Sequence, residues 1–450
     1  MARVGWLVLL LAASGCATAR HDLPKVDPLQ GLAAEWVSDA SGSVPVPSLL
    51  SLIPDPRYEA LARRALENNP DLAVTGARVA ESSALLRAAV SSRRPKVALS
   101  ASGQEQEGGG NTSTSVAMGL DFAWEIDVWS RLADQKGREY LLHGALEADL
   151  RAAQTSLAAR TLQTGLEVVS ARQQVELEER RITSLRRTVE VIEDRYRRGL
   201  EPVADWDAAQ AELASAEANA LSIQLDLGVA ETRLRVLLGD LSRSDLGSLP
   251  SSFPEVSFAQ PALPLEALGN RPDVASAIAS LQAEALGIEV ARKALLPRLT
   301  LTGSIGLGGE SLNDALKSDP VWSVLGALAA PLINRAELLA EHAASQHRRQ
   351  VAAYEYRSIL SVAVGEIDDA LAAEGTLAAQ IPYLERAVDH AHRTRASFAD
   401  GYRRGLVDIL DLLNSQRTAF AAERDLLVSQ AELLTNRVEL GLALGLEAAS

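Results

Sequence analysis

The sequence predicts a mainly α-helical protein that also contributes strands to a membrane β-barrel, built as two tandem repeats. In each repeat we expect a two-stranded β-hairpin and a long antiparallel coiled coil. Three observations lead to this prediction: a pentapeptide that occurs twice, two very long segments almost free of proline, and paired segments of alternating apolar residues. The low aromatic content, 4%, also favours closely packed helices over a β-sandwich.

The duplication is most evident in the pentapeptide Tyr196-Arg-Arg-Gly-Leu200, which returns as Tyr402-Arg-Arg-Gly-Leu406 after 206 residues. Matches at one fixed offset over about fifty residues indicate two copies of a whole substructure. The flanking matches are Asp194 with Asp400, Gln210 with Gln416, Glu217 with Glu423, and Leu238-Gly239 with Leu444-Gly445.

Two long segments predict the coiled coils. Residues 131–198 contain no proline, and residues 335–400 contain only Pro382. A continuous helix of either length would extend for roughly 100 Å, which is typical of a coiled coil. Before each pentapeptide the seam follows the 3, 4, 3, 4 spacing of knobs-into-holes packing. Its positions are Ile182, Leu185, Val189, Ile192 and Tyr196 in the first copy, and Val388, Ala391, Arg395, Phe398 and Tyr402 in the second.

Arg395 interrupts the second seam at the place where Val189 stands in the first. We therefore expect its face of the helix to be partly solvated or paired with an acid.

Each pentapeptide lies between two helical segments and is expected to form a hairpin tip, at about residues 196–202 and 402–408. Pro202 suits the first turn of a returning helix, and Asp408 takes the matching place in the second copy. The first tip continues Glu201-Pro202 where the second continues Val407-Asp408, so the two tips offer a partner two kinds of site.

Four segments predict β-strands, at about residues 96–107, 116–129, 298–308 and 321–333. The second is the clearest, because seven apolar residues from Val116 to Val128 alternate strictly with small or acidic ones. An open polar loop, Gly108 to Ser115, is expected before it.

A soluble sandwich would show similar alternation. Strand lengths near the ~9–11 residues that span a bilayer, with tryptophans near one strand end, favour a membrane barrel. Four strands cannot close a barrel and open edges are not tolerated in lipid, so we expect three chains to share twelve strands.

A helix is expected at about residues 57–93. It contains Asn69-Pro70-Asp71-Leu72, which returns as Arg271-Pro272-Asp273-Val274. Each Pro-Asp is expected at or near a helix start, where proline loses no hydrogen bond and aspartate faces the positive end of the helix dipole.

The N-terminus has the pattern of a lipoprotein signal peptide at residues 1–15, with Arg3, a short apolar run and small residues directly before Cys16, the only cysteine. Cleavage at such a lipobox-like pattern leaves an acylated cysteine that anchors the chain to a membrane. An ordinary signal peptide with an incidental cysteine is the alternative. No other stretch reaches about 18 uninterrupted apolar residues, so no transmembrane helix is expected.

The remaining boundaries follow from composition. Residues 16–56 are rich in proline and serine and are expected to form an extended arm, and residues 241–264 a linker. Between them lies repeat 1 at residues 57–240, and repeat 2 follows at residues 265–450.

The composition and the motifs argue against several functions. A net charge of −15 without a long basic run argues against nucleic acid as a partner. His390 and His392 face different sides of a helix and cannot share a metal, and residues 303–309 are Gly-rich but lack the Lys-Ser/Thr of a phosphate loop. We expect no enzyme activity, no cofactor and no metal site.

Two acids stand apart, because Asp194 and Asp400 each precede a tip tyrosine by two residues. In a trimer they would supply six carboxylates near one end of a helical tube, and like charges so placed repel unless cations or arginines compensate them. They are candidates for a charged constriction at that end. The alternative is that they are solvated residues at helix ends.

The chain resembles the TolC-like outer-membrane efflux proteins over nearly its whole mature length, and most closely their lipoprotein branch, which serves resistance-nodulation-division pumps. The resemblance rests on residues 69–72, 124–129, 271–274, 296–304 and 408–413, together with the two pentapeptides.

The resemblance implies a homotrimer in the outer membrane lipid, with a twelve-stranded barrel continuous with a twelve-helix periplasmic tunnel. The tips would dock onto a periplasmic adaptor that links them to an inner-membrane pump. Acids near the tips would close the tunnel, which makes Asp194 and Asp400 candidates for a periplasmic gate. The Gly199-Leu200 and Gly405-Leu406 pairs match the family's docking motif, while Arg198 and Arg404 replace the small or apolar residue that the family often has before that glycine. All six residues are candidates for adaptor docking.

The expected function is that of a passive exit duct for drugs or other small molecules. A duct for type I protein secretion and a lipid-anchored periplasmic coiled-coil scaffold without a pore are the alternatives.

Overall fold

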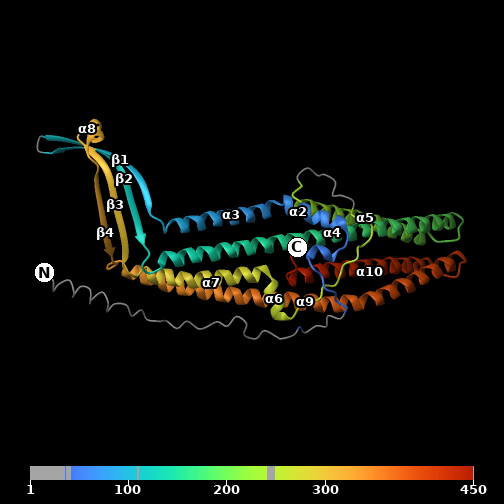
Figure 1. Cartoon of the computed structure of the whole chain (residues 1–450). Helices are drawn as coiled ribbons and strands as arrows, with labels where there is room; N and C mark the ends of the chain where they lie inside the picture. Colours follow the sequence, from blue (N-terminus) through green and yellow to red (C-terminus); the bar gives the residue numbers. More distant parts are fainter. Residues whose placement is uncertain (1–35, 37–41, 109–110, 241–248, 449–450) are drawn as a thin grey trace.

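The computed structural model describes residues 36, 42–108, 111–240 and 249–448. The molecule is elongated, with a β-sheet at one end and the tips of two helical hairpins close together at the other (Figure 1). The predicted signal peptide, Cys16 and most of the predicted arm lie outside the described residues.

The sheet has four antiparallel strands in the order β1-β2-β3-β4. Repeat 1 supplies β1 (Lys96–Gly108) and β2 (Asn111–Ile126), and repeat 2 supplies β3 (Arg298–Gly309) and β4 (Val321–Ala329). The two hairpins join where β2 pairs with β3, so within one chain β1 and β4 are the free edges.

The prediction of an open loop from Gly108 to Ser115 is wrong, because most of this segment pairs in the ladder between β1 and β2. β2 begins at Asn111, and Gln106 pairs with Ser113. Threonine fits a strand surface well, and an antiparallel ladder gives partners to backbone groups that a loop would leave to water. The ladder therefore continues beyond the last apolar residue of the alternating pattern.

The return strands end earlier than the sequence predicts. β2 ends at Ile126 because the Asp127 carboxylate accepts hydrogen bonds from the backbone N–H groups of Leu132 (3.1 Å) and Ala133 (2.9 Å) in the first turn of the next helix. β4 ends at Ala329, shortly before Pro331, which has no N–H to donate to a ladder.

The helices also form two tandem sets. Repeat 1 contains α2 (Pro56–Asn68), α3 (Pro70–Ser91), α4 (Arg131–Arg197) and α5 (Val203–Leu237); repeat 2 contains α6 (Pro264–Asn270), α7 (Pro272–Lys293), α9 (Arg335–Arg403) and α10 (Ile409–Ala443). A short 3₁₀ helix, η1 (Leu49–Leu52), precedes them, and α8 (Leu312–Lys317) lies between β3 and β4. Two β-hairpins and long helices in tandem halves confirm the predicted fold class for the single chain.

The single helix expected at residues 57–93 is in fact two. It breaks at Asn69, whose side-chain oxygen accepts hydrogen bonds from the N–H groups of Asp71 (3.0 Å) and Leu72 (3.1 Å), while Pro70 occupies the first turn of α3. The second copy also breaks before Pro272, where α6 ends at Asn270 and α7 begins, although the Arg271 side chain does not cap the helix. The Pro-Asp motif therefore marks the start of a helix, as its composition indicates.

The main core lies near the middle of the molecule and includes the end of the predicted arm. Leu49, Leu52 and Ile53 are buried there against α4 and α10. The later part of the predicted linker is also packed, since Arg437 donates to the backbone oxygen of Val256 (2.8 Å) and pairs with Glu374. These two segments therefore pack against the helical body.

Among the residues that the structure describes, one helix, α7, is long and apolar enough by composition to cross a membrane. It lies along α4 and α9 in the helical body (Figure 1). Arg138 of α4 forms an ion pair with Glu284 of α7 (2.7 Å), a contact that belongs to a helix packed on another helix.

Candidate functional site at the hairpin tips

Both hairpins turn through the same backbone motif. At the end of α4, the N–H of Gly199 donates to Tyr196 O (2.8 Å) and that of Leu200 to Arg195 O (2.9 Å). This pair of bonds is the Schellman motif, whose C′ residue adopts a left-handed conformation that favours glycine. Gly199 has φ +70°, and Gly405 at the end of α9 has φ +72°.

The glycine of the pentapeptide thus has a structural role. Gly239 and Gly445 end α5 and α10 with the same positive φ, which explains why the Leu-Gly pairs also repeat. The two leucines that follow the tip glycines are different, because each projects into solvent: Leu200 is 64% exposed and Leu406 is 76% exposed. Exposed apolar side chains at the extreme end of a hairpin form a surface suited to a protein partner.

The two candidate gate acids are each paired within their own tip. Asp194 forms an ion pair with Arg198 (2.7 Å), and Asp400 forms ion pairs with Arg404 (2.7 Å) and Arg403 (3.2 Å). Residues proposed separately for gating and for docking are therefore the two halves of the same i,i+4 pairs. Such exposed pairs contribute little to stability, about 0.3–0.5 kcal/mol each.

Sequence reasoning missed a cluster that joins the two tips. The Glu201 carboxylate accepts a hydrogen bond from the Tyr402 hydroxyl (3.3 Å) and pairs with Arg195 (2.9 Å). The Arg195 guanidinium also lies over the Tyr402 ring, 5.0 Å from its centroid, as in a cation–π contact. The one available signal was the difference between Glu201 and its counterpart Val407.

Two groups in this cluster have shifted pKa values. Burial, followed by the negative charge of Glu201, raises the pKa of Tyr402 to about 12, so its hydroxyl remains a donor at neutral pH. Burial also raises the pKa of Asp205, and the neighbouring Glu201 and Asp408 carboxylates raise it further.

Ion pairs and one hydrogen bond join the hairpins farther from the tip. Glu212 of α5 accepts from Arg417 of α10 (2.9 Å) and from Arg181 of α4 (2.8 Å). Burial alone would raise the pKa of Glu212, but the hydrogen bonds from Arg417 and Arg181 outweigh it and lower the pKa. The remaining links are Arg180 with Glu423 (3.1 Å) and Gln416 with Thr188 (3.0 Å).

Neither histidine of the 390–392 pair takes part in a metal cluster. His392 contacts Glu423 (2.8 Å). Within the described part of the chain, no group of three His, Cys, Asp or Glu side chains could hold a metal ion.

A sheet with two free edges, continuous with long helical hairpins that end in charged tips, is the architecture of an outer-membrane channel protein. A family model described as "Outer membrane efflux protein" matches residues 61–240 and 263–446. The chain belongs to this family, and it is the outer-membrane channel of an efflux pump.

Relatives and solved structures agree with this assignment. The chain is 26% identical over 455 residues to the solvent efflux pump outer membrane protein SrpC of Pseudomonas putida, covering 97% of this chain and 96% of the relative. It is 24% identical to the probable outer membrane lipoprotein SilC of Salmonella typhimurium, covering 87% and 86%. The open state of the Neisseria gonorrhoeae MtrE outer membrane channel superposes with a TM-score of 0.83 at 25% identity, covering 95% and 98%.

Proposed function

We propose that three copies of this chain form the exit duct of a tripartite efflux system. In this assembly β1 of each copy pairs with β4 of the next, and the helical hairpins form a periplasmic tunnel. The observation that carries the proposal is the pair of free sheet edges at β1 and β4, since every described residue of β4 is exposed in the single chain. Strand edges are not stable in lipid unless they are paired, and twelve strands suffice to close a barrel.

The tips then serve as the docking surface for a periplasmic adaptor that connects to an inner-membrane pump of the resistance-nodulation-division class. Leu200 and Leu406 supply the apolar contacts, and Arg198 and Arg404 flank them, with Gly199 and Gly405 setting the turn. Asp194 and Asp400 are the gate candidates. They would act by forming ion pairs with the tip arginines, which otherwise repel one another around the ring of tips in the trimer.

The exported molecules are small and chemically varied. The pump selects them, and the duct conducts them passively. The similarity to SrpC, the outer membrane protein of a solvent efflux pump, favours small molecules over protein secretion. Acylation at Cys16 anchors each copy to the outer membrane, and the lipobox-like residues before Cys16 support this step, as does the lipoprotein relative SilC.

The trimer is tested by native mass spectrometry of the full-length protein in detergent, where a mass of three acylated chains is expected. Single-channel recording in planar bilayers tests the duct. A monomer without conductance would contradict the proposal.

Docking is tested by replacing both leucines, Leu200→Asp and Leu406→Asp, in a strain that carries the adaptor and the pump. Loss of export with unchanged trimer formation is expected. Unimpaired export would show that the tips do not provide the docking surface.

A further inference from the structure

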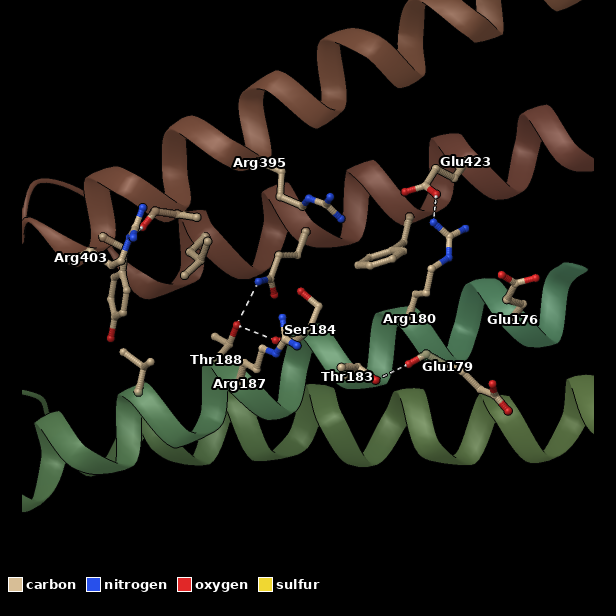
Figure 2. Close-up of a pocket in the computed structure, with 16 residues that line it drawn as sticks. Glu176, Glu179, Arg180, Thr183, Ser184, Arg187, Thr188, Arg395, Arg403 and Glu423 are labelled. Atoms are coloured by element: carbon tan, nitrogen blue, oxygen red, sulfur yellow. Dashed lines mark hydrogen bonds and ion pairs between the residues drawn. The ribbon is translucent and has the colours of Figure 1, made fainter.

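A groove of about 680 Å³ lies between the two hairpins, on the tip side of the molecule's midpoint. Its walls are α4 and α9, and its floor is one face of α10 that includes Gln416 and Phe420 (Figure 2). This volume lies within the range of 300–1,000 Å³ that is common for small-molecule sites. The tip-side half of the groove differs in charge from the chain as a whole, whose net charge is −15.

Two arginines face this half of the groove from opposite walls, Arg187 from α4 and Arg395 from α9. Across the described residues, neither of them forms an ion pair with a carboxylate, whereas Arg180 and Arg403 in the same lining do. Glu176 and Glu179 lie farther along α4; the separation of eight positions from Glu179 to Arg187 corresponds to about 12 Å of helix. Two uncompensated guanidinium groups therefore dominate the field at the tip-side end.

Arg395 also presents a planar surface. Its guanidinium lies 5.2 Å from the centroid of the Phe420 ring, so one face is covered by the phenylalanine. Guanidinium groups stack on aromatic rings as well as binding carboxylates. A ligand ring could stack against this platform while its carboxylate is bound by Arg187.

The floor contains a buried acceptor that lacks a donor. Gln416 is 6% exposed, and its side-chain oxygen has no hydrogen-bond partner among the described residues. Its orientation is fixed by Thr188, whose hydroxyl donates its single hydrogen to Ser184 O (3.1 Å) and can therefore only accept from the Gln416 amide (3.0 Å). Buried acceptors are normally satisfied. The Gln416 oxygen has almost no exposed surface of its own, so a donor on a bound molecule reaches it when the side chains that cover it shift.

We propose that this groove binds a small aromatic carboxylic acid that carries a ring hydroxyl. The carboxylate pairs with Arg187, the ring stacks on Arg395 above Phe420, and the hydroxyl donates to the Gln416 oxygen. The combination is specific to this place in the chain: the positions of Arg395 and Phe420 are taken by Val189 and Ala214 in the other repeat.

The probe for the test is 6-hydroxy-2-naphthoate, added to the full-length protein in a non-ionic detergent and followed by its fluorescence, with protein-free micelles as the blank. One saturable site per chain is expected. Affinity for 2-naphthol, which lacks the carboxylate, is expected to be at least about tenfold weaker, since charge-assisted hydrogen bonds are the strong ones. Affinity for 2-naphthoate is expected to be several-fold weaker because the Gln416 oxygen is left without a donor.

The substitutions Arg187→Ala and Arg395→Val are each expected to weaken binding about tenfold. Arg187 is exposed and its removal leaves the packing intact, while Arg395→Val restores the residue that the first coiled coil has at this place. The matched control is Arg393→Ala, the counterpart of Arg187 in repeat 2, which pairs with Asp389 and should leave binding unchanged.

Absence of saturable binding, equal binding of 2-naphthol, or full affinity in both arginine variants would overturn the proposal. The result does not depend on trimer conductance or on adaptor docking. The experiment therefore tests this proposal independently of the proposed function.

Discussion

The tips of the two hairpins can be compared residue by residue, because a constant offset of 206 relates each position in one to its counterpart in the other. Their backbones are alike: both helices end in a Schellman motif with glycine at positive φ, and both carry an Asp–Arg pair four residues apart. The turn provides hydrogen-bond donors for backbone carbonyl groups that have no partner at a helix end, and the arginines interact favourably with the negative end of the helix dipole. Any helical tip needs these features.

The side chains that face neighbours differ. Tyr402 is only 3% exposed and is held by Glu201 and Arg195 of the other hairpin. Its counterpart Tyr196 is 40% exposed and stacks on Trp206 of its own hairpin, with ring centroids 6.0 Å apart. The comparison teaches that duplication preserved the turn, while each tip diverged according to what lies beside it.

The first prediction concerns the shared feature. Gly405→Val places a β-branched side chain at φ +72°, a strained conformation that costs on the order of 2 kcal/mol. Hydrogen exchange at the Leu406 amide should accelerate by more than tenfold as the end of α9 frays. Gly405→Asn is the control, because asparagine tolerates this conformation and should exchange nearly as the parent does. Equal protection in the valine variant would show that the Schellman turn is not required.

The second prediction asks whether the two acid pairs are equivalent. Asp400 holds two arginines and Asp194 holds one, so removal of Asp400 frees more positive charge at the tip. Closed-state conductance in planar bilayers should rise several-fold in the double variant Asp194→Ala/Asp400→Ala, with Asp400→Ala contributing the larger share. Unchanged closed-state conductance would exclude both acids from the gate.

The third prediction tests the feature that separates the tips. Tyr402→Phe removes the hydrogen bond to Glu201 and should lower stability by about 1 kcal/mol, seen as a lower thermal midpoint by circular dichroism. Tyr196→Phe is the matched control, since its ring stacking on Trp206 is retained, and should have an effect close to zero. Equal losses in the two variants would mean that the cross-hairpin bond contributes nothing.

Sequence alone predicted the features that depend on periodicity. The length of the coiled coils, the strand alternation and the tip turns follow from residue spacing, which local geometry converts directly into structure. The extension of β2 to Asn111 was missed because its hydroxyl residues have no apolar signal, and the ladder is completed by its partner strand.

The candidate site was predicted only in part. Arg395 was recognised as out of place in an apolar seam, but its partner, the Phe420 ring, comes from a different helix. The Glu201–Tyr402 contact likewise joins residues 201 positions apart. Pairings of this kind depend on how the two hairpins pack together, which the spacing within either repeat does not specify.

The last and smallest effect concerns Asp205, whose raised pKa makes the contact between the tips dependent on pH. A carboxyl with a raised pKa binds its proton more tightly in the folded state. Its stabilising contribution is therefore fully present below the unfolded pKa, near 3.8, and is lost as the pH rises through the folded value. Asp205→Asn keeps the group neutral at every pH. The variant should match the parent at pH 3.5 and become more stable than it by a fraction of a kcal/mol at pH 7, measured as the difference in thermal midpoint. Asp411→Asn is the control for the same substitution at the matching place in α10, where Val407 replaces Glu201. A constant difference for Asp205→Asn across the same range would mean that Glu201 and Asp408 do not act on Asp205, and that the asymmetry of the tips lies in Tyr402 alone.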